Sequence, residues 1–256
     1  MIFIDTHTHL FAEEFDSDRS EMFERAASRN IKKFILPNVD VESIARVKKT
    51  VTEFPEICYP LFGLHPCSVN QKYKNDLDLI RKVIDEENPI GIGECGIDLY
   101  WDKTYLQEQK TALKIQCRWA KELNIPVILH VRDAFNEIFE VMDQVNDSRL
   151  SGIFHCFTGG KEEAEKILSY GGFKMGIGGV VTYKTSHLPA LLPEIDLKHI
   201  VLETDSPYLP PVPYRGKRNE SSYLIKVAEK LSEIYQLPLE KIAEITTQNA
   251  TELFKL

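Results

Sequence analysis

Two histidines separated by a single residue, His7 and His9, are the first residues in this chain whose types and spacing could support chemistry. They follow the short apolar run at 2–4 and Asp5. In an extended strand, side chains alternate between the two faces, so both imidazoles would point the same way. Two imidazoles on one face can bind a divalent metal ion. The alternative is a polar pair where a strand frays into solvent, so the motif needs support from the rest of the chain.

Five more polar residues occupy the same kind of position further along the chain. His65, Glu94, His130, His155 and Asp205 each lie in or at the end of a short apolar segment. If these segments are strands of one barrel, their C-terminal ends meet at a common mouth, where barrel enzymes have their active sites. Each residue alone could be an ordinary core or rim residue. Their shared position favours one common site.

Elements that would position these residues alternate along the whole chain. Segments predicted as strands are 2–9, 33–37, 59–66, 90–95, 127–131, 152–157, 173–181 and 200–205. Segments of helical period are 16–29, 41–53, 74–87, 105–123, 134–145, 161–170, 188–192, 221–235 and 239–254. This alternation predicts an α/β fold, a (β/α)8 TIM barrel with an extra C-terminal helix. The alternative, an open doubly wound sheet, would need a glycine-rich turn after the first strand, which the sequence lacks.

Length and composition favour one barrel domain over residues 1–256. The chain is 43% hydrophobic and 27% charged, and no apolar stretch approaches the roughly 20 residues of a membrane span. We expect no signal peptide. Five cysteines form no CxxC pair, as expected for reduced thiols in a cytoplasmic protein. The net charge of −8 argues against broad nonspecific coating of nucleic acid, but it is compatible with a local basic rim.

Five motifs together resemble those of the TatD family of metal-dependent deoxyribonucleases, which belongs to the amidohydrolase-like barrels. They are IDTHTH at 4–9, GLHP at 63–66, IGECGID at 92–98, HCFTG at 155–159 and ETDSPYL at 203–209. The resemblance runs from residue 2 to the C-terminal helices. One departure is Ser221, which stands where the family often has proline. It affects the expected start of the following helix and not the metal site.

The resemblance implies two divalent metal ions held by six residues: His7, His9, Glu94, His130, His155 and Asp205. In this arrangement His7, His9 and Asp205 bind one ion. The other two histidines bind the second, and Glu94 bridges both. Mixed imidazole and carboxylate ligands suit Mg²⁺, Mn²⁺ or Zn²⁺, so the ligand types do not choose the metal. Glu94 and Asp205 are the expected catalytic residues, with Asp205 orienting or deprotonating the attacking water.

Four further residues are candidates for substrate contacts. His65 would touch the substrate or orient a metal ligand, or else only pack at a strand end. Arg132 would meet a phosphate, or else pair with a neighbouring acidic side chain. Tyr100 and Trp101 would stack nucleobases, or else only pack in their loop.

The function that these motifs imply is hydrolysis of DNA by a metal-activated water, most simply as a 3′–5′ exonuclease on single strands. We expect a monomer without a membrane partner, with DNA held by Arg132 and a basic rim of Lys103, Arg215, Lys217 and Arg218. One alternative is a hydrolase of a small amide, lactone or phosphoester, since the barrel hosts many chemistries. Many such relatives bridge their metals with a carboxylated lysine, and the glutamate at position 94 favours the nuclease. A non-catalytic metal-binding protein is the other alternative.

Overall fold

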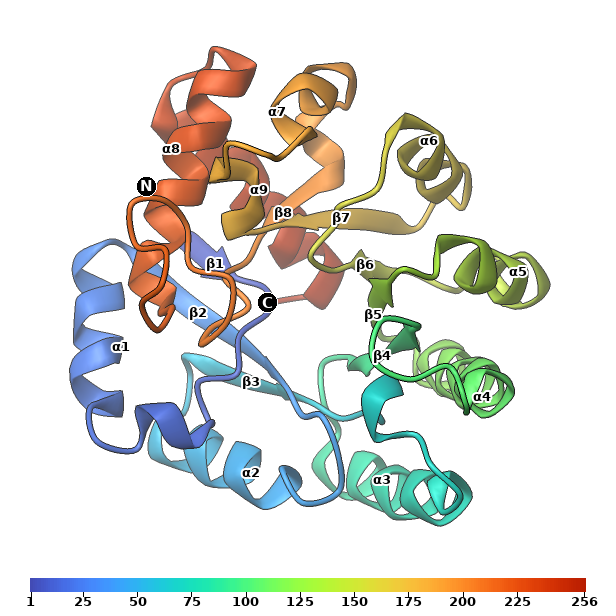
Figure 1. Ribbon diagram of the computed structural model, residues 1–256. Coiled ribbons are helices and arrows are strands. Elements are labelled where there is room, and N and C mark those ends of the chain that lie inside the picture. The colour runs from blue at the N-terminus through green and yellow to red at the C-terminus, as the bar shows by residue number, and fades with distance from the viewer.

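Eight parallel strands form a ring at the centre of the molecule, and helices surround it (Figure 1). The computed structural model describes residues 1–256. The strands are β1 Phe3–Asp5, β2 Ile31–Pro37, β3 Cys58–Leu61, β4 Ile92–Asp98, β5 Val127–Arg132, β6 Gly152–Phe154, β7 Phe173–Ile177 and β8 Ile200–Leu202. The predicted (β/α)8 barrel is therefore confirmed.

Nine α-helices occupy the segments in which the sequence has helical period. They are α1 Arg19–Ser28, α2 Ile44–Glu53, α3 Tyr73–Glu87, α4 Leu106–Leu123, α5 Phe135–Val145, α6 Lys161–Ser169, α7 Leu188–Leu191, α8 Leu224–Tyr235 and α9 Leu239–Phe254. All nine predicted helices exist, with several starting a few residues later than predicted. None combines the length and apolar character that a membrane-crossing helix needs.

Two runs of paired strands, β1 to β3 and β4 to β8, join at both ends to close the ring. Between β3 and β4, the carbonyl of Phe62 accepts a hydrogen bond from Gly93 N at 3.1 Å. Between β8 and β1, the carbonyl of Leu202 accepts one from Thr6 N at 3.0 Å. Closure removes the exposed sheet edges and brings the ends of all eight strands to one mouth.

Several strands end earlier than the sequence predicted, and the chemistry-bearing residues lie just beyond them. The strand expected over 2–9 ends at Asp5, and the one expected over 200–205 ends at Leu202. The backbone bends at Thr6 and His7, although Thr8 N still donates to Ile35 O of β2 at 3.1 Å, and His9 N donates to Ser206 O beyond β8 at 2.7 Å. The expected strand over His7 and His9 was wrong, because β1 ends at Asp5, but the expected convergence of their side chains is observed, with the two Nε2 atoms 3.3 Å apart.

The end of the barrel opposite the mouth is closed by α9. Its residues Ala250 and Phe254 pack with buried side chains from six strands: Ile4, Ile35, Leu61, Ile128, Ile153 and Val201. The amide of Asn249 donates to the carbonyls of Leu197 and Ile200, at the start of β8, at 2.9 and 2.7 Å. A larger apolar cluster fills the layer between the ring and the outer helices. The mouth is thus the end left for polar side chains.

Candidate metal centre

The carboxylate of Glu94 lies at the centre of the mouth, and one of its oxygens faces the β1 side. Glu94 Oε2 lies 3.2 Å from His7 Nε2 and 3.7 Å from His9 Nε2. Asp205 Oδ1 lies 3.6 and 3.4 Å from the same two nitrogens. The two nitrogens are 3.3 Å apart. Two imidazoles and two carboxylates from three distant segments therefore point at one small volume.

The other oxygen of Glu94 faces three histidines. Glu94 Oε1 lies 2.9 Å from His130 Nδ1, 2.9 Å from His155 Nε2 and 3.3 Å from His65 Nε2. The Glu94 side chain is only 3% exposed. All six predicted metal ligands thus meet around one buried carboxylate. His65, expected only as a substrate contact or orienting residue, meets it as well.

Charge balance around Glu94 explains how a buried carboxylate is tolerated. Burial acts to raise the pKa of Glu94, but the charges of nearby histidines and a hydrogen bond from His130 hold it well below its ordinary value. Burial likewise acts to lower the pKa of His155, yet the charges of Glu94 and Glu203 raise it well above the usual value. Protons on His130 and His155, whose pKa values the neighbouring carboxylates raise, offset the negative charge. Divalent ions would displace the protons and supply that charge instead.

The donor set fits divalent metal ions. Imidazole nitrogens that face each other at 3.3 Å can share at most one proton along that line, whereas both can donate lone pairs to a cation. Three overlapping groups each hold their donor atoms within 4.8 Å of one another: His7, His9 and Glu94; His7, His155 and Glu203; and His65, Glu94 and His130. The assignment of individual ligands to two ions stays a prediction.

Two carboxylates that the sequence analysis did not single out contact the ring nitrogens that face away from Glu94, on His130 and His155. Asp98 Oδ2 lies 2.9 Å from His130 Nε2, so the other ring nitrogen faces Glu94. Glu203 Oε1 lies 3.4 Å from His155 Nδ1 and accepts a hydrogen bond from Cys156 N. Carboxylates in this position fix the tautomer of a metal-binding imidazole. Asp98 was detectable, because it lies four residues after Glu94 and hence on the same face of β4.

A glycine in β7 makes room for Glu203. A Cβ on Gly176 would lie 2.0 Å from Glu203 Oε2, closer than any side-chain contact allows. Glu203 is fully buried, and its Oε2 has no hydrogen-bond partner. The small residue in the neighbouring strand therefore permits a carboxylate to stand beneath His155.

Comparison with known proteins gives the chain a family. A family described as TatD related DNase matches residues 4–255. The uncharacterized metal-dependent hydrolase YabD of Bacillus subtilis is 37% identical over 253 residues, covering 98% of each chain. The chain belongs to the TatD family. Its members are metal-dependent hydrolases, so this protein is an enzyme of that class.

Two further TatD-family relatives align over nearly the whole chain. The 3′-5′ ssDNA/RNA exonuclease TatD of a Rahnella species is 31% identical over 254 residues, covering 97% of this chain and 96% of that protein. The crystal structure of YjjV, a TatD homologue from Escherichia coli, superposes with a TM-score of 0.92 at 29% identity, covering 99% of this chain and 98% of that one. The barrel predicted from the sequence is therefore also the fold of a solved relative.

Ser221, the departure from the usual TatD-family motif, has a structural role. It begins a 3₁₀ turn over Ser221–Tyr223, and its hydroxyl donates to Asp5 Oδ2 at 2.6 Å. Asp5 also accepts from Thr204 N at 3.0 Å and Thr204 Oγ1 at 2.6 Å. Burial raises the pKa of Asp5 to about 7, against the opposing effect of these hydrogen bonds. Asp5 therefore ties β1 to the loop that carries Asp205.

The candidate substrate contacts of this TatD-family enzyme gather on one side of the mouth. The guanidinium carbon of Arg132 lies 3.7 Å from the centre of the Tyr100 ring and 5.4 Å from that of Trp101. The two rings are 53% and 71% exposed. Arg132 forms no ion pair, so the alternative pairing with a neighbouring acid was wrong. We call these three residues the Arg132 stack.

The basic rim is smaller than expected. Arg218 pairs with Asp18 at 2.7 Å and lies 4.4 Å from the centre of the Phe15 ring, so it joins its loop to the segment just before α1. Its expected place on a free rim was wrong. Arg215 lies over the Tyr183 ring at 3.9 Å, while Lys103 and Lys217 are exposed.

Proposed function

We propose that this protein is a metal-dependent deoxyribonuclease that removes nucleotides from the 3′ end of single-stranded DNA. The observation that carries the proposal is the convergence of Glu94, its histidines and Asp205 in the barrel mouth, beside the exposed Arg132 stack. The Rahnella relative, named a 3′-5′ ssDNA/RNA exonuclease, supports the polarity and the substrate class.

In this proposal two divalent ions are held by His7, His9, Glu94, His130, His155 and Asp205. Bound there, they would lower the pKa of a water molecule and stabilise charge on the attacking and leaving oxygens of a phosphodiester. The carboxylate of Glu94 keeps the two halves of the site together because each of its oxygens faces a different set of histidines. Asp98 and Glu203 hold two of those imidazoles in the required orientation.

Asp205 is the residue placed to take a proton from the attacking water. Burial acts to raise its pKa, but the hydrogen bond with His9 and neighbouring histidine charges lower it below the ordinary value. Asp205 is therefore ionised at neutral pH and can accept a hydrogen bond or a proton. The water oxygen bonds to phosphorus, the bond between phosphorus and the upstream O3′ breaks, and the departing oxygen takes a proton from solvent.

The Arg132 stack would hold the strand on the far side of the scissile phosphate. A guanidinium binds phosphate through charge-assisted hydrogen bonds, and exposed aromatic rings stack on bases of any sequence.

We further propose that the enzyme is cytoplasmic, which agrees with its five cysteines being free thiols. We also propose that it acts as a monomer.

A substrate panel tests the proposal. Purified protein with Mg²⁺, Mn²⁺ or Zn²⁺ is incubated with single-stranded DNA, duplex DNA and single-stranded RNA, beside a lactone, an amide and a small phosphoester. Fastest turnover of single-stranded DNA, with mononucleotides as the first products, would support it. Turnover of a lactone or amide with no cleavage of any nucleic acid would overturn it in favour of a small-molecule hydrolase.

A further inference from the structure

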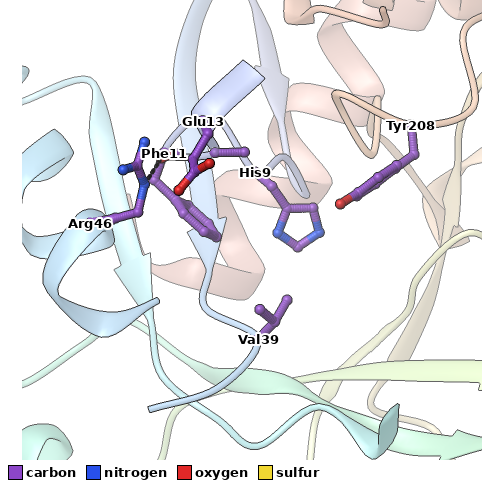
Figure 2. Close-up of a pocket in the computed structure, with 7 residues that line it drawn as sticks. His9, Phe11, Glu13, Val39, Arg46 and Tyr208 are labelled. Atoms are coloured by element: carbon purple, nitrogen blue, oxygen red, sulfur yellow. Dashed lines mark hydrogen bonds between the residues drawn. The ribbon is translucent and has the colours of Figure 1, made fainter. Parts of the chain in front are cut away.

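A pocket of about 210 Å³ opens beside the metal centre, where His9 forms part of its lining. Figure 2 shows the His9 ring at its middle, with Phe11, Glu13 and Arg46 on one side and Tyr208 on the other. The ring centres of Phe11 and Tyr208 lie 5.6 and 6.0 Å from that of His9. We call this cavity the His9 pocket.

The size and walls of the His9 pocket suit one ring-sized group. Pockets for complete small ligands are roughly 300–1,000 Å³, so this one is small. Phe11 and Val39 give apolar walls, and the Tyr208 ring is 55% exposed. An exposed aromatic ring above apolar walls is the surface on which a nucleobase stacks. His9 Nδ1 has no hydrogen-bond partner within the protein.

Two charged side chains, Arg46 and Glu13, line the pocket. Arg46 donates to the carbonyl of Phe11 at 2.9 Å and shares Asp16 Oδ1 with Arg19, at 2.5 and 2.6 Å, so its hydrogen-bond donors are already engaged. Glu13 is exposed and forms no ion pair or side-chain hydrogen bond. The charged side chain without a partner at this end of the pocket is therefore the carboxylate of Glu13. A carboxylate accepts a hydrogen bond from a hydroxyl and repels a phosphate.

We propose that the His9 pocket binds the terminal nucleoside of the strand, and that Glu13 selects a free 3′-hydroxyl over a 3′-phosphate there. An internal nucleotide carries a phosphate on both sides, whereas a terminal one carries a phosphate only toward the metal centre. The negative charge of Glu13 thus excludes a continuing strand. The proposal rests on the proposed nuclease function and explains why cleavage would begin at a chain end.

Matched oligonucleotides test the role of Glu13. Two single strands of identical sequence, one ending in a 3′-hydroxyl and one in a 3′-phosphate, are compared by kcat/KM. We expect the wild type to prefer the hydroxyl end by at least about fivefold, and Glu13→Gln to lose most of that preference. Glu13→Lys should favour the phosphate end. Glu24→Gln, an equal charge change on the exposed face of α1, should behave as the wild type. An equal preference in wild type and Glu13→Gln would overturn the selection.

Binding of free thymidine tests the pocket without requiring cleavage. Saturation-transfer NMR should detect thymidine on the wild type and on Tyr208→Phe, which keeps the ring. Tyr208→Ala should weaken binding by about 5- to 100-fold. If no oligonucleotide is cleaved but thymidine binding depends on Tyr208, the nuclease proposal fails while the nucleoside pocket stands. If thymidine does not bind, or binds equally to Tyr208→Ala, the pocket proposal is overturned.

Discussion

Asp98 and His130 are joined by a 2.9 Å contact between Asp98 Oδ2 and His130 Nε2. The other carboxylate oxygen of Asp98 accepts a hydrogen bond from Tyr100 N at 2.9 Å. One buried side chain therefore orients a proposed metal ligand and also anchors the loop that carries the exposed aromatic rings. Hydrogen bonds from His130 and the backbone of that loop lower the pKa of Asp98 to about 2, although burial opposes them.

Replacing Asp98 with asparagine should weaken the second metal position. The amide can no longer hold the His130 tautomer through a charged acceptor, so metal affinity and kcat should each fall by about 10- to 100-fold. Calorimetric titration with the metal measures the affinity, and steady-state kinetics measures kcat. Asp102→Asn is the matched control, because Asp102 is an exposed aspartate of the same loop. Unchanged metal affinity in Asp98→Asn would contradict this role.

Gly176→Ala should reduce activity through Glu203. The added Cβ would collide with Glu203 Oε2, and overpacking of this kind costs about 1–3 kcal/mol of stability. Gly178→Ala is the control, since its Cβ would lie 3.4 Å from the Glu203 carbonyl oxygen, an ordinary contact. In a Glu203→Ala background, Gly176→Ala should cost much less, as coupled neighbours do. Additive losses in the double variant would show that the glycine acts elsewhere.

Asp5 should make the metal-free protein less stable as the pH rises. Its folded pKa of about 7 lies above the ordinary 3.8, so the folded state keeps a proton that the unfolded chain has released. This contribution to the free energy of unfolding therefore decreases between about pH 4 and pH 7. The advantage of wild type over Asp5→Asn should shrink by roughly 2–3 kcal/mol from pH 5 to pH 8. Urea unfolding in excess chelator measures it, and a constant difference would rule out the raised pKa.

DNA binding should depend on the Arg132 stack and only weakly on salt. One to four contacts to single-strand phosphates give a salt slope of roughly −1 to −3. Tyr100→Ala or Trp101→Ala should weaken binding by about 1–3 kcal/mol, without changing hydrolysis of a minimal phosphodiester. Leu79→Ala, which removes an exposed apolar side chain from α3, is the control. A steep slope with no effect of either aromatic residue would place the DNA path elsewhere.

The barrel was predictable because the spacing of apolar residues along the sequence distinguishes its strands from its helices. Each predicted strand and helix corresponds to an observed one, and the expected meeting of Glu94 and Asp205 at the mouth is observed, although Glu94 lies within β4 and Asp205 lies beyond the end of β8. The strand limits were less predictable, since hydrogen bonds such as Thr8 N to Ile35 O join segments distant in sequence. His7 and His9 lie just past the end of β1, and between them Thr8 N still bonds to β2.

Residues that act through another residue were the hardest to find. Glu203 resembles an ordinary acidic residue next to Asp205, and only the space left by Gly176 shows that it is buried beneath His155. Arg218 was expected on a free basic rim, but it is paired with Asp18. A charged loop residue gives no sign in sequence of its partner, and Asp18 lies 200 positions away. Such pairings depend on tertiary structure alone.

The most direct test of a bridged metal centre that cleaves DNA is a joint measurement of bound metal and cleavage rate in wild type and Glu94→Ala. Excess chelator should abolish cleavage of single-stranded DNA by the wild type, and Mg²⁺, Mn²⁺ or Zn²⁺ should restore it. Glu94→Ala should fold, bind at least one ion fewer and lose at least about 10²-fold in kcat, because the shared carboxylate is missing. A folded Glu94→Ala variant with the wild-type metal content and cleavage rate would contradict the account.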